Sequence, residues 1–320
     1  MKRIFVYEYL SGGGPRAGAE GAGDDLLAMG QAMRDALAVD LSRLEDYDVS
    51  VATGDPATPV PEGTRPVVSF KGESAFDFVA RQADAHHLVW VVAPETGGVL
   101  AQLQRRVDPG RWLGCDGAAI ELASSKRSTL LRLGGAGLTT PLNFEHAPQT
   151  TRWVVKPDDG AGAIDTWLHA SREEAWQDAS RRSTTGRPIT IEPWIEGQAL
   201  SLSLLCSAGR TELLSINRQH LAIDEQGSLS FQGVEINTMP TTSPHGRELS
   251  ALSTRVGRSI AGLRGFVGID LVWHAARGPV VIEINPRATC AYVELSRALR
   301  RNLAAEVVAN HDRYSFHGTS

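Results

Sequence analysis

Short apolar and β-branched runs alternate with amphipathic stretches along the first third of the chain. The runs fall at 4–9, 49–53, 67–70 and 88–93, and each has the length of a single strand. Helical patterns lie between the later runs, as at 75–85, and another follows the last run at 97–107. This alternation is typical of a parallel sheet covered by helices, so the sequence predicts an α/β fold here.

Strands dominate from residue 124 onward. A helix predicted at 124–133 is followed by strands at 153–156, 166–169, 189–192, 200–207 and 210–216, with a helix at 172–183 among them. A helix at 248–263, a hairpin at 266–284 and a helix at 294–310 complete the pattern. Two blocks of this kind predict two α+β lobes behind the α/β domain, with domains at 1–122, 123–195 and 196–320. The cleft between such lobes is a natural ligand site.

The composition argues against several classes of protein. The chain has 320 residues, of which 42% are hydrophobic and 22% charged, as expected for a globular fold. A net charge of −5 argues against a nucleic-acid partner. No apolar run approaches the roughly 20 residues of a membrane helix, and Glu8 interrupts the first one, which argues against a signal peptide. We therefore expect a cytoplasmic protein without membrane partners.

The cysteines and the first glycine-rich stretch carry weak signals. Cys115, Cys206 and Cys290 are far apart and lack metal-ligand spacing, so we expect buried or incidental thiols. Residues 12–17 formally satisfy the dinucleotide pattern G-x-G-x-x-[G/A], but Pro15 and further glycines delay the helix that the fingerprint requires. We favour a flexible loop at 12–23 that touches substrate over a nicotinamide or flavin site.

The hairpin near the end of the chain carries the strongest chemical signal. Side chains alternate along a strand, so Glu283 and Asn285 share one face, and Asp270 on the adjacent strand adds a second carboxylate. Oxygen ligands of this kind suit Mg²⁺, although a solvated polar face is the plain alternative. Arg287 follows the strand and could clamp a phosphate or carboxylate, or neutralise the acidic pair.

Two further segments have residues suited to a nucleotide. Lys156 ends a strand and precedes a loop with Gly160 and Gly162, where backbone N–H groups can approach an anion, although no Walker pattern is present. Lys126 begins a predicted helix, whose N-terminus also favours anions. The alternative for each is a surface lysine.

The run at 192–197 has two interpretations. It is a strand leading into a turn, or a hinge whose backbone groups pair with an adenine edge. The candidate nucleotide-binding residues of this run are Glu192, Trp194, Ile195 and Glu196.

Taken in order, Lys126, Lys156 with its glycine loop, the 192–197 run, Asp270 and the run from Glu283 to Arg287 resemble the ATP-grasp superfamily of carboxylate-amine ligases. The segment before them resembles that superfamily's N-terminal, Rossmann-like pre-ATP-grasp domain. Residues 7–14, 93–96 and 285–289 are similar to the tyramine-glutamate ligase group of methanofuran biosynthesis.

The resemblance implies a fold in which two α+β lobes grip ATP behind the pre-ATP-grasp domain. It implies that both lysines contact the phosphates, that the loop of Gly160 and Gly162 closes over them, and that the run from Glu192 to Ile195 addresses adenine. It also implies that Asp270, Glu283 and Asn285 hold one or two Mg²⁺, with Mn²⁺ as a substitute, and that Arg287 steadies the transferring group. The ribose carboxylate of many relatives is missing, and Glu196 or Ser201 would replace it.

The expected activity is an ADP-forming ligation of the γ-carboxylate of L-glutamate to tyramine or a tyrosine-like amine through an acyl phosphate. For the substrates, a carboxylate pairs with an ammonium, so Glu8 with Gly12 and Gly13 is expected to face the amine, and Arg218 to bind an α-carboxylate. A loop acid and a surface arginine are the equal alternatives for Glu8 and Arg218. The alternatives are another amino acid ligase, forming dipeptides or polyglutamate, and a nonenzymatic ATP-binding regulator. A homodimer is the assembly considered.

Overall fold

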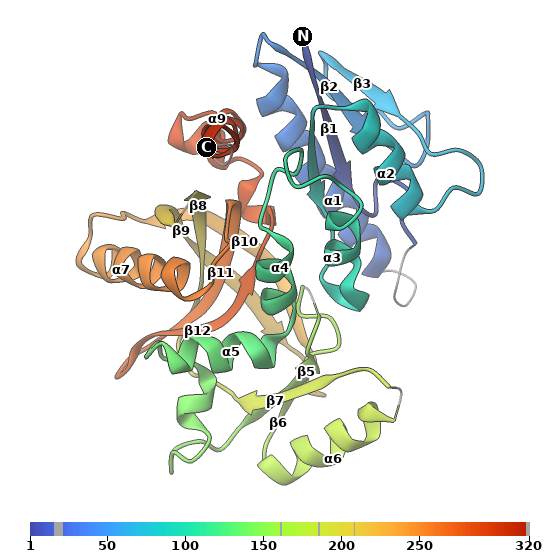
Figure 1. Cartoon of the computed structure of the whole chain (residues 1–320). Helices are drawn as coiled ribbons and strands as arrows, with labels where there is room; N and C mark the ends of the chain where they lie inside the picture. The colour runs from blue at the N-terminus through green and yellow to red at the C-terminus, as the bar shows by residue number, and fades with distance from the viewer. Residues whose placement is uncertain (16–21, 161, 185, 208, 318–320) are drawn as a thin grey trace.

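The computed structural model describes residues 1–15, 22–160, 162–184, 186–207 and 209–317, which form three sheets with helices packed around them (Figure 1). Each sheet falls within one of the three predicted domain ranges, although those boundaries stay a prediction. No helix in the described ranges is long and apolar enough to cross a membrane.

The first sheet is parallel and has the strand order β3-β2-β1-β4. Its strands are β1 (Lys2–Glu8), β2 (Tyr47–Ala52), β3 (Thr64–Val67) and β4 (Leu88–Val92). The chain moves outward from β1 to β3 and then returns to the other side of β1. The carboxyl ends of β1 and β4 therefore form a topological switch point, where ligands bind in open α/β sheets.

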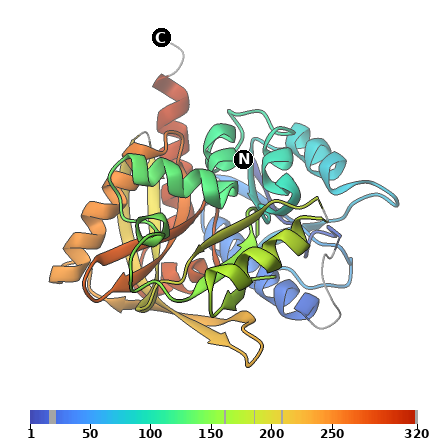
Figure 2. The same ribbon diagram turned by 90° about the horizontal axis from the view of Figure 1, so that it is seen from below.

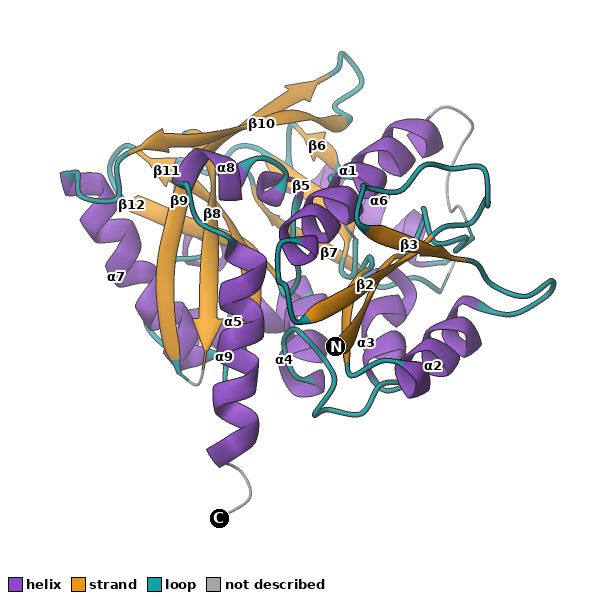
Figure 3. Cartoon of the chain, turned by 90° about the horizontal axis from the view of Figure 1, so that it is seen from above, coloured by secondary structure: helices purple, strands orange, loops and turns teal. Residues whose placement is uncertain are grey.

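Both faces of this sheet are covered because side chains alternate along β1. Phe5 and Tyr7 pack on Phe78 of α2 (Ala75–Ala85), and α3 (Val99–Gln104) lies on the same face. Ile4 belongs to the opposite core with Leu37 of α1 (Ala22–Ser42) and with α9 (Leu303–His317). Figure 3 shows α1 and α2 on the two sides of this sheet.

The second sheet, β6-β5-β7, is antiparallel and small. It consists of β5 (Trp153–Pro157), β6 (Trp167–His169) and β7 (Ile189–Pro193), with α6 (Arg172–Ser183) against one face. In Figure 2, α6 lies on the outside of the molecule. Trp153 and Val155 pack in the core that α6 shares, whereas Val154 and Lys156 line a cavity on the other face of the sheet.

The third sheet is antiparallel with the order β10-β9-β8-β11-β12. Its strands are β8 (Gln198–Ser207), β9 (Arg210–Ile223), β10 (Leu229–Met239), β11 (Gly265–His274) and β12 (Gly278–Asn285). One face is covered by α4 (Gly117–Ser124), α5 (Lys126–Gly135) and α7 (Pro244–Ser259), which share its apolar core. Short 3-10 turns lie at η1 (Thr96–Gly98), η2 (Pro141–Phe144) and η3 (Cys290–Tyr292).

The periodic elements agree closely with the sequence analysis, and the mixed α/β and α+β fold class is confirmed. The helices predicted at 75–85 and 172–183 have those bounds, and the strand predicted at 67–70 lies at 64–67 instead. The analysis missed α1, α4 and β10. The predicted loop at 12–23 overlaps the start of α1, and its residues 16–21 lie outside the described ranges. The last predicted helix is broken into α8 (Leu295–Leu299) and α9, because Arg300 takes a left-handed conformation with φ 54°.

Candidate functional site

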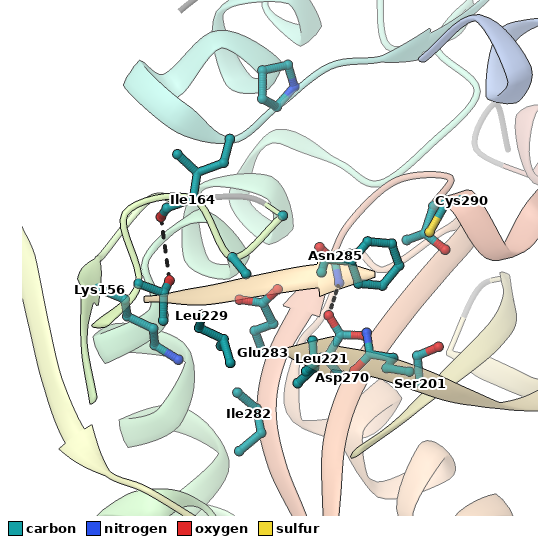
Figure 4. Close-up of a pocket in the computed structure, with 18 of the residues that line it drawn as sticks. Lys156, Ile164, Ser201, Leu221, Leu229, Asp270, Ile282, Glu283, Asn285 and Cys290 are labelled. Atoms are coloured by element: carbon teal, nitrogen blue, oxygen red, sulfur yellow. Dashed lines mark hydrogen bonds between the residues drawn. The ribbon is translucent and has the colours of Figure 1, made fainter. Parts of the chain in front are cut away.

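One cavity of about 670 Å³ lies where the three sheets meet. It brings together residues from all three predicted domains, and Figure 4 shows part of its lining. The predicted site residues that line it are Glu8, Lys126, Lys156, Gly160, Gly162, Glu192, Trp194, Ile195, Asp270, Glu283, Asn285 and Arg287. Gly12, Gly13, Glu196 and Arg218 do not line it.

The two predicted metal-binding carboxylates lie side by side on β11 and β12. Asp270 pairs directly with Glu283 in the register of these strands, and Asn285 Nδ2 donates to Asp270 Oδ2 at 3.1 Å. Burial raises the pKa of Asp270 well above its usual value, and Glu283 raises it further. Burial alone would raise the pKa of Glu283 too, but Lys126 and Lys156 hold it below its usual value.

The charge of this arrangement suits a hard divalent cation, but the number of protein ligands is small. Two adjacent half-buried carboxylates repel each other and gain from a shared cation. However, the described residues contain no cluster of three or more His, Cys, Asp or Glu side chains able to hold a metal. Asp270, Glu283 and Asn285 therefore supply few ligands by themselves, as expected for Mg²⁺ held jointly with phosphate oxygens.

The two lysines enter the cavity from different elements, and each meets a carboxylate. Ser125 caps α5 by accepting from Ser128 N, which leaves Lys126 in the first turn. Lys126 Nζ lies 3.1 Å from Glu283 Oε2 and also donates to the Gly160 carbonyl. Burial alone would lower the pKa of Lys126, but Glu283 raises it above its usual value. Lys126 is therefore cationic beside the glycine loop.

The second lysine and the hinge form a buried polar group. Lys156 Nζ donates to Glu192 Oε1 between β5 and β7, and both side chains are buried. Glu192 Oε2 and Trp194 Nε1 are buried and have no hydrogen-bond partner among the described residues. Buried polar atoms of this kind need a partner, so an acceptor and a donor remain available to a ligand here.

The glycine loop after β5 is attached to the first domain. Asp159 Oδ2 accepts from Gly97 N at 2.8 Å, and the Asp159 carbonyl accepts from Thr96 Oγ1 at 3.1 Å. Gly162 has φ 67°, a conformation that favours glycine. The loop is thus held between the lobes beside Lys126.

Arg287 is held by Glu95, which the sequence analysis did not select. Arg287 Nε lies 2.9 Å from Glu95 Oε1, and Nη2 donates to Oε2 at 3.0 Å. Glu95 follows β4 and is buried, so this ion pair joins the first domain to the third sheet. In the sequence, the one feature that could have indicated Glu95 is that it is an acidic residue just after a strand of the parallel sheet.

Strand alternation separates Arg218 from the cavity and brings its neighbour in. Arg218 is exposed, whereas Gln219 lines the cavity and donates from Nε2 to Asp270 Oδ1 at 3.0 Å. Glu196 is also on the surface, where it pairs with Arg152. Ser201 lines the cavity, so of the two predicted ribose substitutes only Ser201 lies at the site.

Glu8 lies at the carboxyl end of β1 and is 4% exposed. Its carboxylate accepts from Leu10 N at 3.2 Å and Ser11 N at 2.7 Å, and no ion pair to it is present in the described part of the chain. Burial raises its pKa above the usual value, although these hydrogen bonds oppose the shift. Gly12 N donates to the Glu8 carbonyl at 2.8 Å, so the glycines shape the turn after β1.

The thiols do not supply a nucleophile. All three cysteines are free, and Cys290, which lines the cavity, has its pKa raised by burial to about 11. A thiol of this kind is protonated near neutral pH.

Comparison with known proteins gives the family. Residues 123–291 match the model of the ATP-grasp domain, and residues 48–120 match the pre ATP-grasp 3 domain. Over 202 residues the chain is 30% identical to the carbamoyl phosphate synthase large chain of Thermomicrobium roseum. That match covers 58% of this chain and 18% of that protein, so the chain spans about a fifth of that relative.

Solved structures share the fold at low identity. An ATP-grasp superfamily protein from Archaeoglobus fulgidus is 21% identical with a TM-score of 0.67, and the match covers 97% of this chain and 88% of that one. The L-amino acid ligase of Bacillus licheniformis is 17% identical with a TM-score of 0.66 over 97% and 74% of the two chains. The D-alanine–D-alanine ligase of Bacillus anthracis, solved with ATP, is 15% identical with a TM-score of 0.65 over 99% and 100%. Because the matching ATP-grasp domain spans more than half of the sequence, this chain belongs to the ATP-grasp family.

Proposed function

We propose that this protein is an ADP-forming ligase that activates a carboxylate with ATP and joins it to an amine. The observation that carries the proposal is the convergence of two lysines, a carboxylate pair and an ion-paired arginine in one cavity between the domains. Phosphoryl transfer depends on positioning and on stabilisation of negative charge, and these residues supply both.

In the proposed reaction a carboxylate oxygen attacks the γ-phosphorus of ATP, and the bond from that phosphorus to the bridging oxygen of ADP breaks. The amine nitrogen then attacks the acyl carbon, the C–N bond forms, and phosphate leaves as the amine gives up a proton. Lys126 and Lys156 neutralise the phosphate charge, and Arg287 steadies the transferring group. Glu192 and Trp194 accept from and donate to the base through the atoms that lack partners.

Asp270, Glu283 and Asn285 would hold Mg²⁺, which when bound supplies charge neutralisation between the phosphate oxygens. Gln219 fixes one oxygen of Asp270 through its side-chain amide. Closure of the loop with Gly160 and Gly162 would exclude water from the acyl phosphate.

For the substrates, we propose the γ-carboxylate of L-glutamate and tyramine or a tyrosine-like amine, as in methanofuran-type cofactor biosynthesis. The support is the similarity of the short runs at 7–14, 93–96 and 285–289 to that group, together with the buried Glu8 carboxylate at the cavity. Arg218 would reach an α-carboxylate only from outside the cavity, which makes Arg287 the better candidate for that contact.

The second candidate is an amino acid ligase with another pair of substrates, in keeping with the shared fold of the L-amino acid and D-alanine ligases. A nonenzymatic ATP-binding regulator is the alternative of a different class. Nucleotide sensing alone does not require the paired carboxylates and Arg287 together, which favours an enzyme.

The test is ADP release by the purified protein with Mg-ATP and single amino acids, each with and without tyramine or tyrosine, with product masses measured in parallel. Turnover that requires glutamate and one aromatic amine, with an amide product, supports the proposal. Turnover with another pair supports the second candidate, and ATP binding without turnover on any pair supports the regulator.

A further inference from the structure

Asp159 ties the loop that follows β5 to the first domain. Its Oδ2 accepts from Gly97 N at 2.8 Å, and its carbonyl accepts from Thr96 Oγ1 at 3.1 Å. A carboxylate that accepts from an N–H group forms a charge-assisted hydrogen bond, which is stronger than a neutral one. Asp159 follows a strand of the second sheet and Gly97 follows β4 of the first, so the bond joins two domains.

The segment that holds Asp159 also holds Arg287. Glu95, Thr96 and Gly97 are consecutive, and we call them the 95–97 turn. Arg287 Nε lies 2.9 Å from Glu95 Oε1, while the next two residues of the turn bind Asp159. Gly97 has φ 63°, a left-handed conformation that favours glycine. The positions of Arg287 and Asp159 are therefore set by one short segment.

Gly160, the next residue of the loop, connects Asp159 to the first lysine. Its carbonyl accepts from Lys126 Nζ, which also lies 3.1 Å from Glu283 Oε2. Lys126 is 8% exposed, so its ammonium is largely removed from water and depends on these contacts. Because Gly160 is bonded directly to Asp159, a displacement of Asp159 moves the carbonyl that holds Lys126.

The residues after Gly160 make such a displacement favourable once Asp159 is released. Ala163 and Asp165 have φ 61° and 53°, left-handed conformations that are unfavourable for residues other than glycine. Backbone of this kind persists where surrounding contacts hold it. Without the bond to Gly97, we expect this part of the chain to relax and the Gly160 carbonyl to leave Lys126.

The second lysine is held independently. Lys156 Nζ donates to Glu192 Oε1 between β5 and β7, and both strands belong to the second sheet. This contact does not pass through the 95–97 turn. Lys156 therefore provides an internal comparison for effects that are specific to Lys126.

We infer that Asp159 is a positioning residue that fixes Lys126 relative to Arg287. The 95–97 turn holds Arg287 and Asp159 together, and the Gly160 carbonyl extends this arrangement to Lys126. The inference rests on the proposed ligase function and adds a residue that touches neither nucleotide nor metal in that proposal. Because both cations act on the transferring phosphoryl group, loss of Asp159 lowers the rate of transfer and leaves nucleotide binding nearly unchanged.

The first test reports on Lys126 directly and needs no substrate. The ligand-free full chain is labelled with dilute acetic anhydride, and mass spectrometry gives the rate of acetylation at each lysine. Lys71 is exposed and serves as the reference. We expect Asp159→Ala to raise the labelling rate of Lys126 about tenfold relative to Lys71 and to leave that of Lys156 unchanged.

Two further variants separate the hydrogen bond from the charge. Asp159→Asn keeps an oxygen that can accept from Gly97 N, so we expect Lys126 labelling within about threefold of the parent protein. The matched control is Asp165→Asn, which removes the charge of another aspartate of the loop, at 56% side-chain exposure, and should leave Lys126 labelling unchanged. Unchanged labelling of Lys126 in Asp159→Ala, or an equal rise at Lys156, overturns the inference.

The second test distinguishes positioning from a contribution to folding alone. With Mg-ATP and a substrate pair that gives turnover, Asp159→Ala should lower kcat at least about 30-fold, with KM for ATP and Kd for Mg-ADP within about threefold. Asp159→Asn should keep kcat within about threefold of the parent. An unchanged kcat with a raised KM for ATP would contradict the inference.

The inference and the proposed ligase fail in different ways. Selective labelling of Lys126 in Asp159→Ala, without amide formation by the parent protein from any tested pair, would retain the positioning of Lys126 and reject the ligase. Amide formation by Asp159→Ala at the parent rate, with Lys126 still protected, would retain the ligase and reject the role of Asp159.

Discussion

The ion pair between Glu95 and Arg287 offers the sharpest test of how the domains are joined. Glu95→Gln keeps the size of the side chain and one hydrogen-bond acceptor but removes the negative charge. Arg287 then stays buried, at 12% side-chain exposure, without its main partner. We expect the variant to be clearly less stable than the parent protein.

The magnitude follows from the geometry. At 2.9 Å and an effective dielectric constant of about 20, two unit charges attract by roughly 6 kcal/mol. Much of this offsets the desolvation of the two ions, and removing one partner of such a pair commonly costs about 3 to 5 kcal/mol. Glu283 also acts on Arg287 and remains in the variant, so we expect a loss of about 3 kcal/mol.

The assay is the melting temperature of the ligand-free protein at two salt concentrations. For a chain of this size about 2 °C per kcal/mol is expected, so Glu95→Gln should lower the melting temperature by about 6 °C. The control is Glu121→Gln, which removes an exposed ion pair with Arg105, at 55% and 60% side-chain exposure, and should change it by less than about 1 °C. Equal shifts in the two variants would falsify the reasoning.

Three further predictions concern the cavity. Asp270→Asn should raise the melting temperature of the metal-free protein, because burial and Glu283 oppose the charge of Asp270, and it should lower the rate of ADP release at least about 100-fold. A lower melting temperature together with unchanged ADP release would reject the metal site. Because the pKa of Glu8 is raised in the folded protein, the stability that this group contributes is present at low pH and is lost as pH rises through that pKa. Melting temperatures measured from pH 4 to pH 8 should fall accordingly, and this pH dependence should be absent in Glu8→Gln. Gly30→Ala should cost about 1 to 3 kcal/mol in urea unfolding, since its Cβ would meet Glu8, whereas Gly135→Ala, with open space around the Cβ, should be neutral or stabilising; equal effects would contradict the close approach.

The family comparison is consistent with what short motifs could predict. Lys126, Lys156 with its glycine loop, the 192–197 run, Asp270 and the run from Glu283 to Arg287 together indicated the ATP-grasp fold, which the matched domains confirm. The roles of the individual residues stay predictions. The structure places these residues, which are up to 157 positions apart in the sequence, around one cavity.

The misses have physical reasons. The pattern of α1 was obscured by the glycine and alanine that precede it, since these residues are typical of loops as well. Arg218 was preferred to Gln219 because charge is visible in a sequence, whereas the face to which a side chain points depends on register. The pairing of β9 with β8 and β10 fixes the faces of this strand, and Gln219 rather than Arg218 reaches the Asp270 carboxylate.

The sequence by itself determined what is local: the strands and helices with clear periodicity, the absence of long apolar runs, and the shared strand face of Glu283 and Asn285. Alternation and capping depend on neighbours within a few residues, so they can be recognised without knowledge of the fold. Only the tertiary structure decided which charges meet. Glu95 lies 192 positions from Arg287, and Gly30 approaches Glu8 from a helix that packs on the first sheet. Contacts of this kind arise from packing between elements, and packing is a property of the whole chain.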